Sequence, residues 1–296
     1  MTPASLRTLL TNIIDYAGLF PPAGLDMVSA VQNYRAYFSG EESWALGRFI
    51  VPVARLEEFS RAYKEISPSV SDRPWCLSVL ASADLHADRS AILEFNRRHK
   101  PAAVIDTVEM KASTVDEIKK ARTTTPSEIE IYFEIPIDTN PEGLVHAIGE
   151  TQSRAKARTG GVTPDAFPQS SDLLRFIDTC TKAGVPFKAT AGLHHPIRSM
   201  QKLTYEHDAP TGMMYGYLNV FLTVAFVQAG MEITEAIHIL EEQSPEAFTF
   251  SDEGVSWREH RLTTTQLQAV RTRCAVSFGS CSFREPLDDL RAMNLL

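Results

Sequence analysis

AKARTGG at residues 155–161 and FKATAGLHHP at residues 187–196, two stretches about thirty residues apart, decide the fold. In each stretch a lysine lies late in a strand-like run with apolar neighbours, and glycine breaks the run. Between them, residues 172–183 have the apolar spacing of a helix, which Gly184 ends. Because neighbouring parallel strands need a crossover helix, this strand–helix–strand unit predicts a parallel sheet. Side chains at the carboxyl ends of such strands can meet a ligand.

Strand and helix alternate in the same way through the preceding part of the chain. Apolar runs separated by helix caps and turn residues predict six strands, at residues 48–53, 75–81, 103–109, 129–136, a run ending at 158, and 185–191. Units of about 25 to 30 residues favour an α/β fold of the (β/α)8 type, a TIM barrel or a variant of it. We therefore expect one barrel domain over residues 1–296, with six clear βα units at residues 26–195.

The two ends of the chain do not follow this alternation. Residues 1–25 are predicted to form a short helix and an apolar loop, in which glycines and prolines prevent the helix from continuing. Residues 196–296 are predicted to be irregular and mostly helical, with a long buried helix at 212–229 and a β-hairpin at 248–257. A last strand or loop is expected at 277–283. The two strands missing from an eight-stranded barrel are expected in this C-terminal part.

Composition argues against two classes of partner. A net charge of -8 and a pI near 5.5 give no general attraction for nucleic acid or for anionic membranes. Residues 209–231 carry no charge, but they contain Pro210 and lack basic flanks, so a buried helix is expected and not a membrane span. The four cysteines lack metal-ligand spacing and nothing N-terminal resembles a signal peptide, which predicts reduced thiols in the cytoplasm. The expected partners are a small anionic metabolite and further copies of the chain in a homo-oligomer.

Basic side chains collect at the predicted ends of the fifth and sixth strands. Alternate residues of a strand share a face, so Lys156 points the same way as Arg158, and Lys188 the same way as Thr190. Two lysines and an arginine would then meet at the mouth of the barrel. A buried lysine is costly unless it is paired, which favours a functional role. The alternatives are an outward-pointing side chain and a structural ion pair.

Carboxylates interrupt two of the apolar strands and the N-terminal loop. Glu134 ends the run IYFE, and Glu109 lies similarly late in the run VIDTVE. Such a group is expected to be neutral or paired, so Glu134 is a candidate proton carrier or a counter-ion to Lys156 or Lys188. A salt bridge at the barrel rim is the alternative for both glutamates. Asp15 is either a turn residue or an acid that points into the pocket.

These groups together favour chemistry on a carbonyl compound. A lysine whose pKa is lowered by burial and by a second cation can attack a carbonyl and form a Schiff base. In this hypothesis Lys188 is the nucleophile, Lys156 is the second cation, and Glu134 is the acid or base. The predicted function is an enzyme for a small anionic carbonyl compound, a Schiff-base lyase or aldolase that needs no cofactor.

Lysines near the ends of late strands, together with a carboxylate, resemble the class I aldolase barrels of the deoxyribose-phosphate aldolase kind. The resemblance rests on Lys156, Lys188 and Glu134, and it covers about the middle half of the chain. It implies a barrel with lyase activity, but it does not extend to the arginine or to the paired histidines. The phrases AGLHHP (191–196) and FGSCSF (278–283) also resemble a bacterial family of uncharacterised proteins, which implies no activity.

Further side chains are assigned to substrate binding. In the segment RTGG, a guanidinium, a hydroxyl and two glycine amides form a cradle for a carboxylate or phosphate, unless the arginine is structural. Asn219 lies alone in the apolar helix, where it is a satisfied core amide or reaches the ligand. An unreactive buried thiol is the favoured prediction for Cys281, with a nucleophile as the alternative. The predicted substrate-binding residues are Arg158, Thr159, Thr190, Glu109, Asp15 and Asn219.

The paired histidines carry the main alternative function. His194 and His195 are adjacent, so on an extended backbone only one of them would enter the pocket. His194 is predicted to act in acid–base catalysis or to orient the substrate. A divalent metal bound by His194, His195 and Glu134 would instead indicate a metal-dependent hydrolase or isomerase, although no HxH or HExxH spacing is present. A non-catalytic small-molecule binding protein is the third hypothesis.

Overall fold

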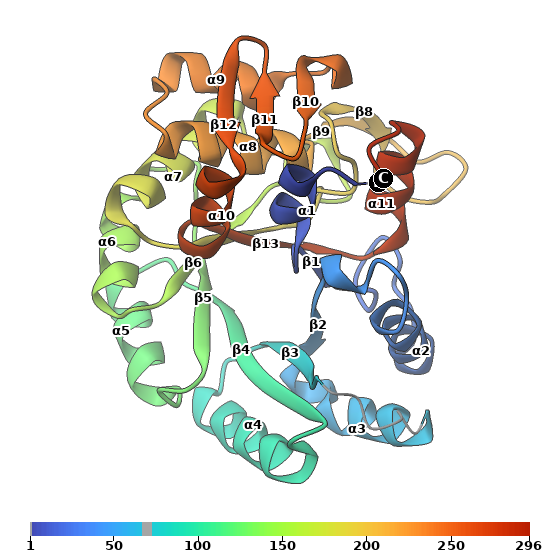
Figure 1. Ribbon diagram of the computed structural model, residues 1–296. Helices are drawn as coiled ribbons and strands as arrows, with labels where there is room; N and C mark the ends of the chain where they lie inside the picture. The colour runs from blue at the N-terminus through green and yellow to red at the C-terminus, as the bar shows by residue number, and fades with distance from the viewer. Residues whose placement is uncertain (1, 67–72) are drawn as a thin grey trace.

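Eight parallel strands close into a barrel in the computed structural model, which describes residues 2–66 and 73–296 (Figure 1). Around the barrel the strands follow the order β1-β13-β7-β6-β5-β4-β3-β2, and each neighbouring pair is parallel. The predicted TIM-barrel fold is confirmed. The barrel strands are β1 (Ile14–Tyr16), β2 (Leu46–Pro52), β3 (Trp75–Leu80), β4 (Ala103–Lys111), β5 (Glu130–Glu134), β6 (Arg154–Arg158), β7 (Phe187–Thr190) and β13 (Ala275–Ser280).

Crossover helices surround the strands, and Figure 1 shows α2 to α7 spread around the outside of the barrel. Local sequence sets several of their ends: Thr114 and Glu117 form a capping box at the start of α5, and Gly184, with a φ of 64°, ends α7. The helices are α1 (Ala4–Leu10), α2 (Met27–Phe38), α3 (Leu56–Glu65), α4 (Leu85–His99), α5 (Val115–Thr124), α6 (Glu142–Glu150), α7 (Ser170–Ala183), α8 (Tyr217–Gln228), α9 (Ile233–Glu241), α10 (Thr264–Arg273) and α11 (Arg284–Ala292).

One of the two strands missing from the prediction comes from the N-terminus. The expectation that both lie in residues 196–296 is therefore wrong. β1 has three residues, too few for an alternating pattern, and it lies between β2 and β13 in the closed barrel. Its hydrogen-bond partners are supplied by barrel closure, which the local sequence does not show. β13 is the expected C-terminal strand, and it begins at Ala275, slightly before the predicted position.

The C-terminal part contains the predicted buried helix and hairpin, with one difference. The apolar helix is α8, which packs against α7, α9, α10 and β13. It begins at Tyr217 and not at residue 212, because β9 (Thr211–Met214) pairs with β8 (Ser199–Lys202) in an antiparallel hairpin. The predicted hairpin is β10 (Phe248–Phe250) and β11 (Gly254–Trp257), to which β12 (His260–Thr263) adds a third strand. No helix within residues 2–66 and 73–296 is long and apolar enough to cross a membrane.

Charged side chains occupy the inside of the barrel, which in TIM barrels is usually filled by branched apolar residues. A bulge in β4 helps to place them, because Leu77 pairs with Ile105 but Ser78 pairs with Thr107. Asp106 and Glu109 are three residues apart and would face opposite sides of a regular strand. The extra residue lets both enter the barrel, where Asp106 binds an arginine and Glu109 binds lysines.

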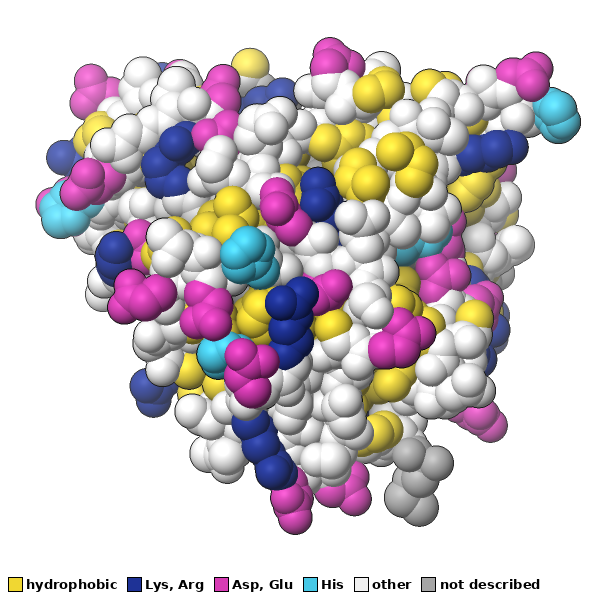
Figure 2. Space-filling model, turned by 90° about the horizontal axis from the view of Figure 1, so that it is seen from above, with side chains coloured by type: hydrophobic (Ala, Val, Ile, Leu, Met, Phe, Trp, Pro, Cys, Tyr) yellow, Lys and Arg dark blue, Asp and Glu magenta, His cyan; other side chains and the backbone are white. Residues whose placement is uncertain are grey.

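The outer surface also carries charges of both signs (Figure 2). Figure 2, seen from above, shows acidic and basic side chains next to one another across that face. A face that binds a phosphate backbone carries an extended basic surface. The face in Figure 2 has none.

Candidate active site

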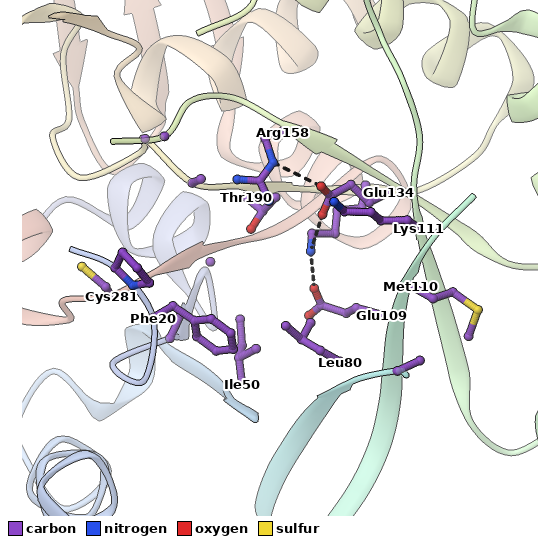
Figure 3. Close-up of a pocket in the computed structure, with 18 of the residues that line it drawn as sticks. Phe20, Ile50, Leu80, Glu109, Met110, Lys111, Glu134, Arg158, Thr190 and Cys281 are labelled. Atoms are coloured by element: carbon purple, nitrogen blue, oxygen red, sulfur yellow. Dashed lines mark hydrogen bonds and ion pairs between the residues drawn. The ribbon is translucent and has the colours of Figure 1, made fainter. Parts of the chain in front are cut away.

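A cavity of about 970 Å³ opens at the carboxyl ends of the barrel strands (Figure 3). This is the end of a TIM barrel at which active sites form. Phe20, Ile50 and Leu80 give the cavity an apolar side, and charged residues from β4, β5 and β6 line the other side. A smaller cavity of about 560 Å³ adjoins it, and the two share Lys111, Glu117, Glu134 and Arg158.

Lys156 lies in the floor of this cavity between two carboxylates. Its Nζ is 2.8 Å from Glu109 Oε2 and 2.9 Å from Glu134 Oε2 (Figure 3). Lys156 is 5% exposed and lines the cavity. Strand register explains one of the contacts, because Glu134 and Lys156 are direct partners on β5 and β6. Of the roles predicted for Glu134, this contact confirms that of a counter-ion to Lys156, and the role of a proton carrier stays a prediction.

Glu109 connects the two buried lysines. Its Oε1 accepts hydrogen bonds of 2.6 Å from Lys188 Nζ and from Ser78 Oγ, while its Oε2 forms the ion pair with Lys156. Burial raises the pKa of Glu109, but the two ammonium groups outweigh burial and hold that pKa well below its ordinary value. Burial likewise raises the pKa of Glu134, and Lys156 with Arg158 lowers it overall. Both acids are therefore ionised near neutral pH and can accept protons.

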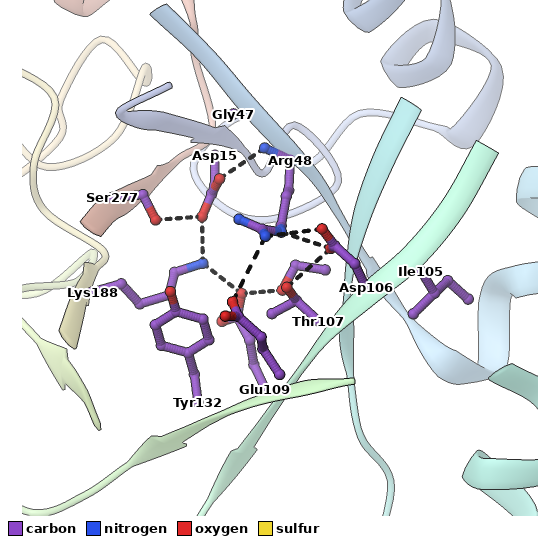
Figure 4. A network of polar contacts seen from close by, with 12 residues as sticks. Asp15, Gly47, Arg48, Ile105, Asp106, Thr107, Glu109, Tyr132, Lys188 and Ser277 are labelled. Atoms are coloured by element: carbon purple, nitrogen blue, oxygen red, sulfur yellow. Dashed lines mark hydrogen bonds and ion pairs between the residues drawn. The ribbon is translucent and has the colours of Figure 1, made fainter. Parts of the chain in front are cut away.

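Lys188 is buried and does not line the cavity. Figure 4 shows it between Asp15 and Glu109. Its Nζ donates hydrogen bonds of 2.6 Å to Asp15 Oδ2 and to Glu109 Oε1, and the residue is 1% exposed. Burial lowers the pKa of Lys188, but the two carboxylates outweigh burial and raise that pKa above its ordinary value. The predicted role of Lys188 as the nucleophile does not fit this geometry, because a nucleophilic lysine must reach the substrate and Lys188 does not line the cavity.

Asp15 is neither a turn residue nor an acid in the cavity, its two predicted alternatives, because it lies in β1 and its side chain is buried against Lys188. Its Oδ2 also accepts a 2.8 Å hydrogen bond from Ser277 Oγ. A Cβ atom on residue 47 would lie only 2.3 Å from Asp15 Oδ1, so β2 can approach Asp15 this closely only because that residue is glycine. The predicted contact of Asp15 with substrate is not supported, because the side chain is enclosed.

A second ion-pair network lies near the amino ends of the strands, where its side chains are partly exposed, and it is absent from the predictions. Arg48 donates from Nε and from an amino nitrogen to the two oxygens of Asp106, at 2.7 and 2.9 Å (Figure 4). Arg154 forms an ion pair with Glu130. The pattern that could have indicated this network is RAKAR in β6, where every second residue is basic while the others are apolar.

Arg158 and Thr190 line the cavity, as predicted, whereas Thr159 does not. Arg158 Nε is 3.2 Å from Glu134 Oε1, and half of its side chain is exposed, so the other guanidinium N–H groups remain available to an anion. Thr159 is fully buried, and its hydroxyl donates a 2.6 Å hydrogen bond to the carbonyl oxygen of Ala191. The predicted substrate contact of Thr159 is wrong, because its hydroxyl fastens the loop after β7.

Asn219 is a core amide and not a ligand contact. It is fully buried, and its Nδ2 donates to the carbonyl oxygens of Ile239 and Glu242 at 2.7 and 2.8 Å. Its Oδ1 accepts a 2.9 Å hydrogen bond from the backbone N–H of Arg198. The amide thus joins α8 to the end of α9, and the alternative of substrate binding is wrong.

Both paired histidines line the cavity, contrary to the prediction that only one would. The prediction assumed an extended backbone, but Ala191 has a φ of 62° and the chain bends after β7. His194 Nδ1 lies 2.9 Å from Glu285 Oε2, and His195 Nδ1 lies 2.6 Å from Asp289 Oδ2. The two acids are one turn apart on α11, which therefore orients both rings.

The alternative metal site is not assembled. His194 and His195 contact the acids of α11, whereas Glu134 contacts Lys156 and Arg158. In the part of the chain that the structure describes, no group of three or more His, Cys, Asp or Glu side chains is placed to hold a metal ion. The three side chains named for this site do not converge on one point.

Cys281 lines the cavity and is 5% exposed. Burial raises the pKa of its thiol, although a contact of 3.6 Å with the Tyr205 hydroxyl acts in the opposite direction. A cysteine nucleophile needs the thiolate, which this environment disfavours. The favoured prediction of an unreactive thiol fits this geometry.

Comparison with models of known protein families gives no match, and no curated protein matches the chain either. A closed eight-stranded parallel barrel with its polar cavity at the carboxyl ends of the strands is a common enzyme fold. Because this fold supports many reactions, the chemistry has to be argued from the site itself.

Proposed function

We propose that this protein is an enzyme in which Lys156 forms a Schiff base with a small anionic carbonyl compound. The position of Lys156 carries the proposal: of the two buried lysines in the described chain, it is the one that lines the cavity. Lys188 lies beneath it, on the other oxygen of Glu109. The roles predicted for the two lysines are thereby exchanged.

Attack on a carbonyl carbon needs the neutral amine. Glu134 Oε2, 2.9 Å from Lys156 Nζ, takes up one proton of the ammonium. The nitrogen lone pair then forms the C–N bond, and a proton moves from nitrogen to the former carbonyl oxygen. The resulting hydroxyl accepts the proton held by Glu134 and leaves as water. The product is a protonated imine on Lys156, and Glu134 is again a carboxylate.

Other side chains of the cavity suit an anionic substrate. Arg158 keeps free N–H groups beside Lys156, and guanidinium groups bind carboxylate and phosphate well. Lys111 lines the same region and adds a second exposed cation. The apolar side formed by Phe20, Ile50 and Leu80 can hold the carbon skeleton. A lyase or aldolase of small keto acids or sugar phosphates fits these features.

Borohydride trapping tests the proposal. The protein is incubated with a pool of keto acids and sugar phosphates, reduced with borohydride, and digested for mass spectrometry. We expect a reduced adduct on Lys156 and none after Lys156→Met. Lys202→Met is the matched control, because Lys202 lines the same cavity from β8 without a pair of buried carboxylates, and the adduct should persist in it.

Each other outcome favours a different function. An adduct on Lys188 would restore the role predicted from the sequence, and the absence of any adduct on either lysine would refute the Schiff base. A stoichiometric metal in the purified protein would favour a metal-dependent hydrolase or isomerase. Ligand binding that weakens in Lys156→Met, with no turnover found, would favour a binding protein.

A further inference from the structure

A second group of polar side chains faces the cavity from across the barrel. This imidazole wall consists of His194, Tyr205, Cys281 and Glu285, which all line the cavity. His194 follows β7, Tyr205 lies between β8 and β9, and Cys281 and Glu285 follow β13. The carboxylates beside Lys156 are on β4 and β5. In the barrel order β13 lies opposite β4, and Figure 3 shows Cys281 on the far side of the cavity from the carboxylates. A substrate bound to Lys156 would therefore lie between two different polar walls.

Glu285 orients the ring of His194. Its Oε2 lies 2.9 Å from His194 Nδ1 and accepts a 3.2 Å hydrogen bond from the Tyr205 hydroxyl. Burial raises the pKa of Glu285, but the hydrogen bond and charge of His194 outweigh burial and lower that pKa, so the group is a carboxylate. A carboxylate has no proton to donate, which makes Nδ1 the nitrogen that carries hydrogen. In the described structure His194 Nε2 has no protein hydrogen-bond partner.

Tethering of the loop after β7 to α11 is a structural explanation for the contact between His194 and Glu285, and it applies to the neighbouring pair of His195 and Asp289 as well. His195 and Asp289 also tie the loop after β7 to α11, with a contact of 2.6 Å. Asp289 does not line the cavity, whereas Glu285 does. The pair His194–Glu285 thus has the same tethering contact and, in addition, a carboxylate, a hydroxyl and a free ring nitrogen at the cavity. His195 provides a matched comparison.

We propose that His194 is the base that removes a proton from the carbon next to the imine carbon on Lys156. This inference rests on the proposed Schiff base. His194 Nε2 takes the proton, the C–H electron pair becomes the C=C bond of an enamine, and the C=N π pair moves to the lysine nitrogen. Glu285 stabilises the imidazolium that forms, and the reverse step returns the proton to carbon.

The acids beside Lys156 are poorly suited to this step. Their pKa values are lowered by the lysines, so Glu109 and Glu134 are weak bases toward a C–H bond. Imidazole is the side chain that accepts and returns protons near neutral pH. The two walls then divide the chemistry, with formation of the imine on one side and proton transfer at carbon on the other.

Exchange with deuterated water tests the assignment, with pyruvate and dihydroxyacetone phosphate as probes. Proton NMR follows loss of the C–H signal next to the carbonyl, and borohydride trapping in parallel reports the imine on Lys156. We expect His194→Asn to keep the adduct and to slow exchange about 10²- to 10⁴-fold. His195→Asn should keep both the adduct and the exchange rate.

A second variant covers the case in which His194→Asn fails to fold. Glu285→Gln keeps the imidazole but removes the charge that stabilises its protonated form, so the acid limb of the pH–rate profile for exchange should move to lower pH. An unchanged profile, or unchanged exchange in a folded His194→Asn variant, would overturn the inference while the adduct on Lys156 still supports the proposed function. Equal losses in the His194 and His195 variants would indicate a structural role and also overturn it. Absence of any adduct in the unmodified protein refutes both proposals.

Discussion

Lys156 and Lys188 are direct register partners on neighbouring strands, yet they lie in different environments. Lys188 is enclosed between Asp15 and Glu109 and also faces the ring of Tyr132, 5.4 Å from its centroid. Lys156 contacts the other oxygen of Glu109, but one side of its ammonium group opens to the cavity. The same residue type on the same face of the sheet is structural in one strand and accessible in the next. Neighbouring strands therefore decide which lysine lines the cavity.

The largest expected effect comes from removing the enclosed lysine. Lys188→Met leaves Asp15 and Glu109 buried with less positive charge, which should lower the free energy of unfolding by about 3 to 5 kcal/mol. Urea denaturation followed by circular dichroism measures the change. A loss below about 1 kcal/mol would show that the layer beneath the cavity is open to water, and would remove the contrast between the two lysines.

Lys156→Met should cost less stability, about 1 to 2 kcal/mol by the same measurement. Glu109 keeps its hydrogen bonds to Lys188 and Ser78, and Glu134 keeps its ion pair with Arg158. In the trapping experiment the larger effect should come from Lys156→Met, which loses the adduct. If Lys156→Met proved the less stable variant, Lys156 would be the main structural cation of the barrel.

Low pH should lower the free energy of unfolding through the two carboxylates that Lys156 contacts. The pKa values of Glu109 and Glu134 lie below the ordinary 4.5 in the folded protein, so the unfolded chain binds more protons. Their contribution to stability is complete above about pH 5 and is lost as the pH falls through the unfolded value toward the folded ones. In Lys156→Met both pKa values move back up, so the unfolding free energy should fall less steeply between about pH 5 and 3. Equal slopes in urea titrations of the two proteins would contradict the coupling.

Arg158→Gln should have the smallest effect on stability, below about 1 kcal/mol, because half of the side chain is exposed and its one ion pair is near solvent. Its effect on ligand binding should be larger. We expect the concentration of probe needed for half-maximal trapping at Lys156 to rise about tenfold, since the anionic group loses a charged hydrogen bond of about 1.5 to 3 kcal/mol. Lys202→Gln, on the β8–β9 side of the cavity, serves as the control. An equal rise in both variants would mean that general charge, and not Arg158, attracts the ligand.

Prediction from sequence succeeded where the pattern is local. The alternation of helix and strand between residues 26 and 195 was sufficient for the barrel, because each βα unit buries its own apolar stripe and repeats the same connection. The position of Lys156 near a carboxylate followed from strand periodicity in the same way. Prediction failed at β1, where three residues carry no period and the pairing partners are Leu46 and Phe278, far away in sequence.

The sequence by itself determined the barrel, the glycine-broken strand ends and the set of lysines and carboxylates that point inward. Only the tertiary structure decided which lysine reaches the cavity, because the depth of a side chain depends on strand stagger and on acids such as Asp15 that arrive from the opposite end of the chain. It also decided that His194 and His195 share the cavity, since a bend after β7 and the acids of α11 turn both rings the same way. Long-range contacts, and not local periodicity, set the charge around each reactive group.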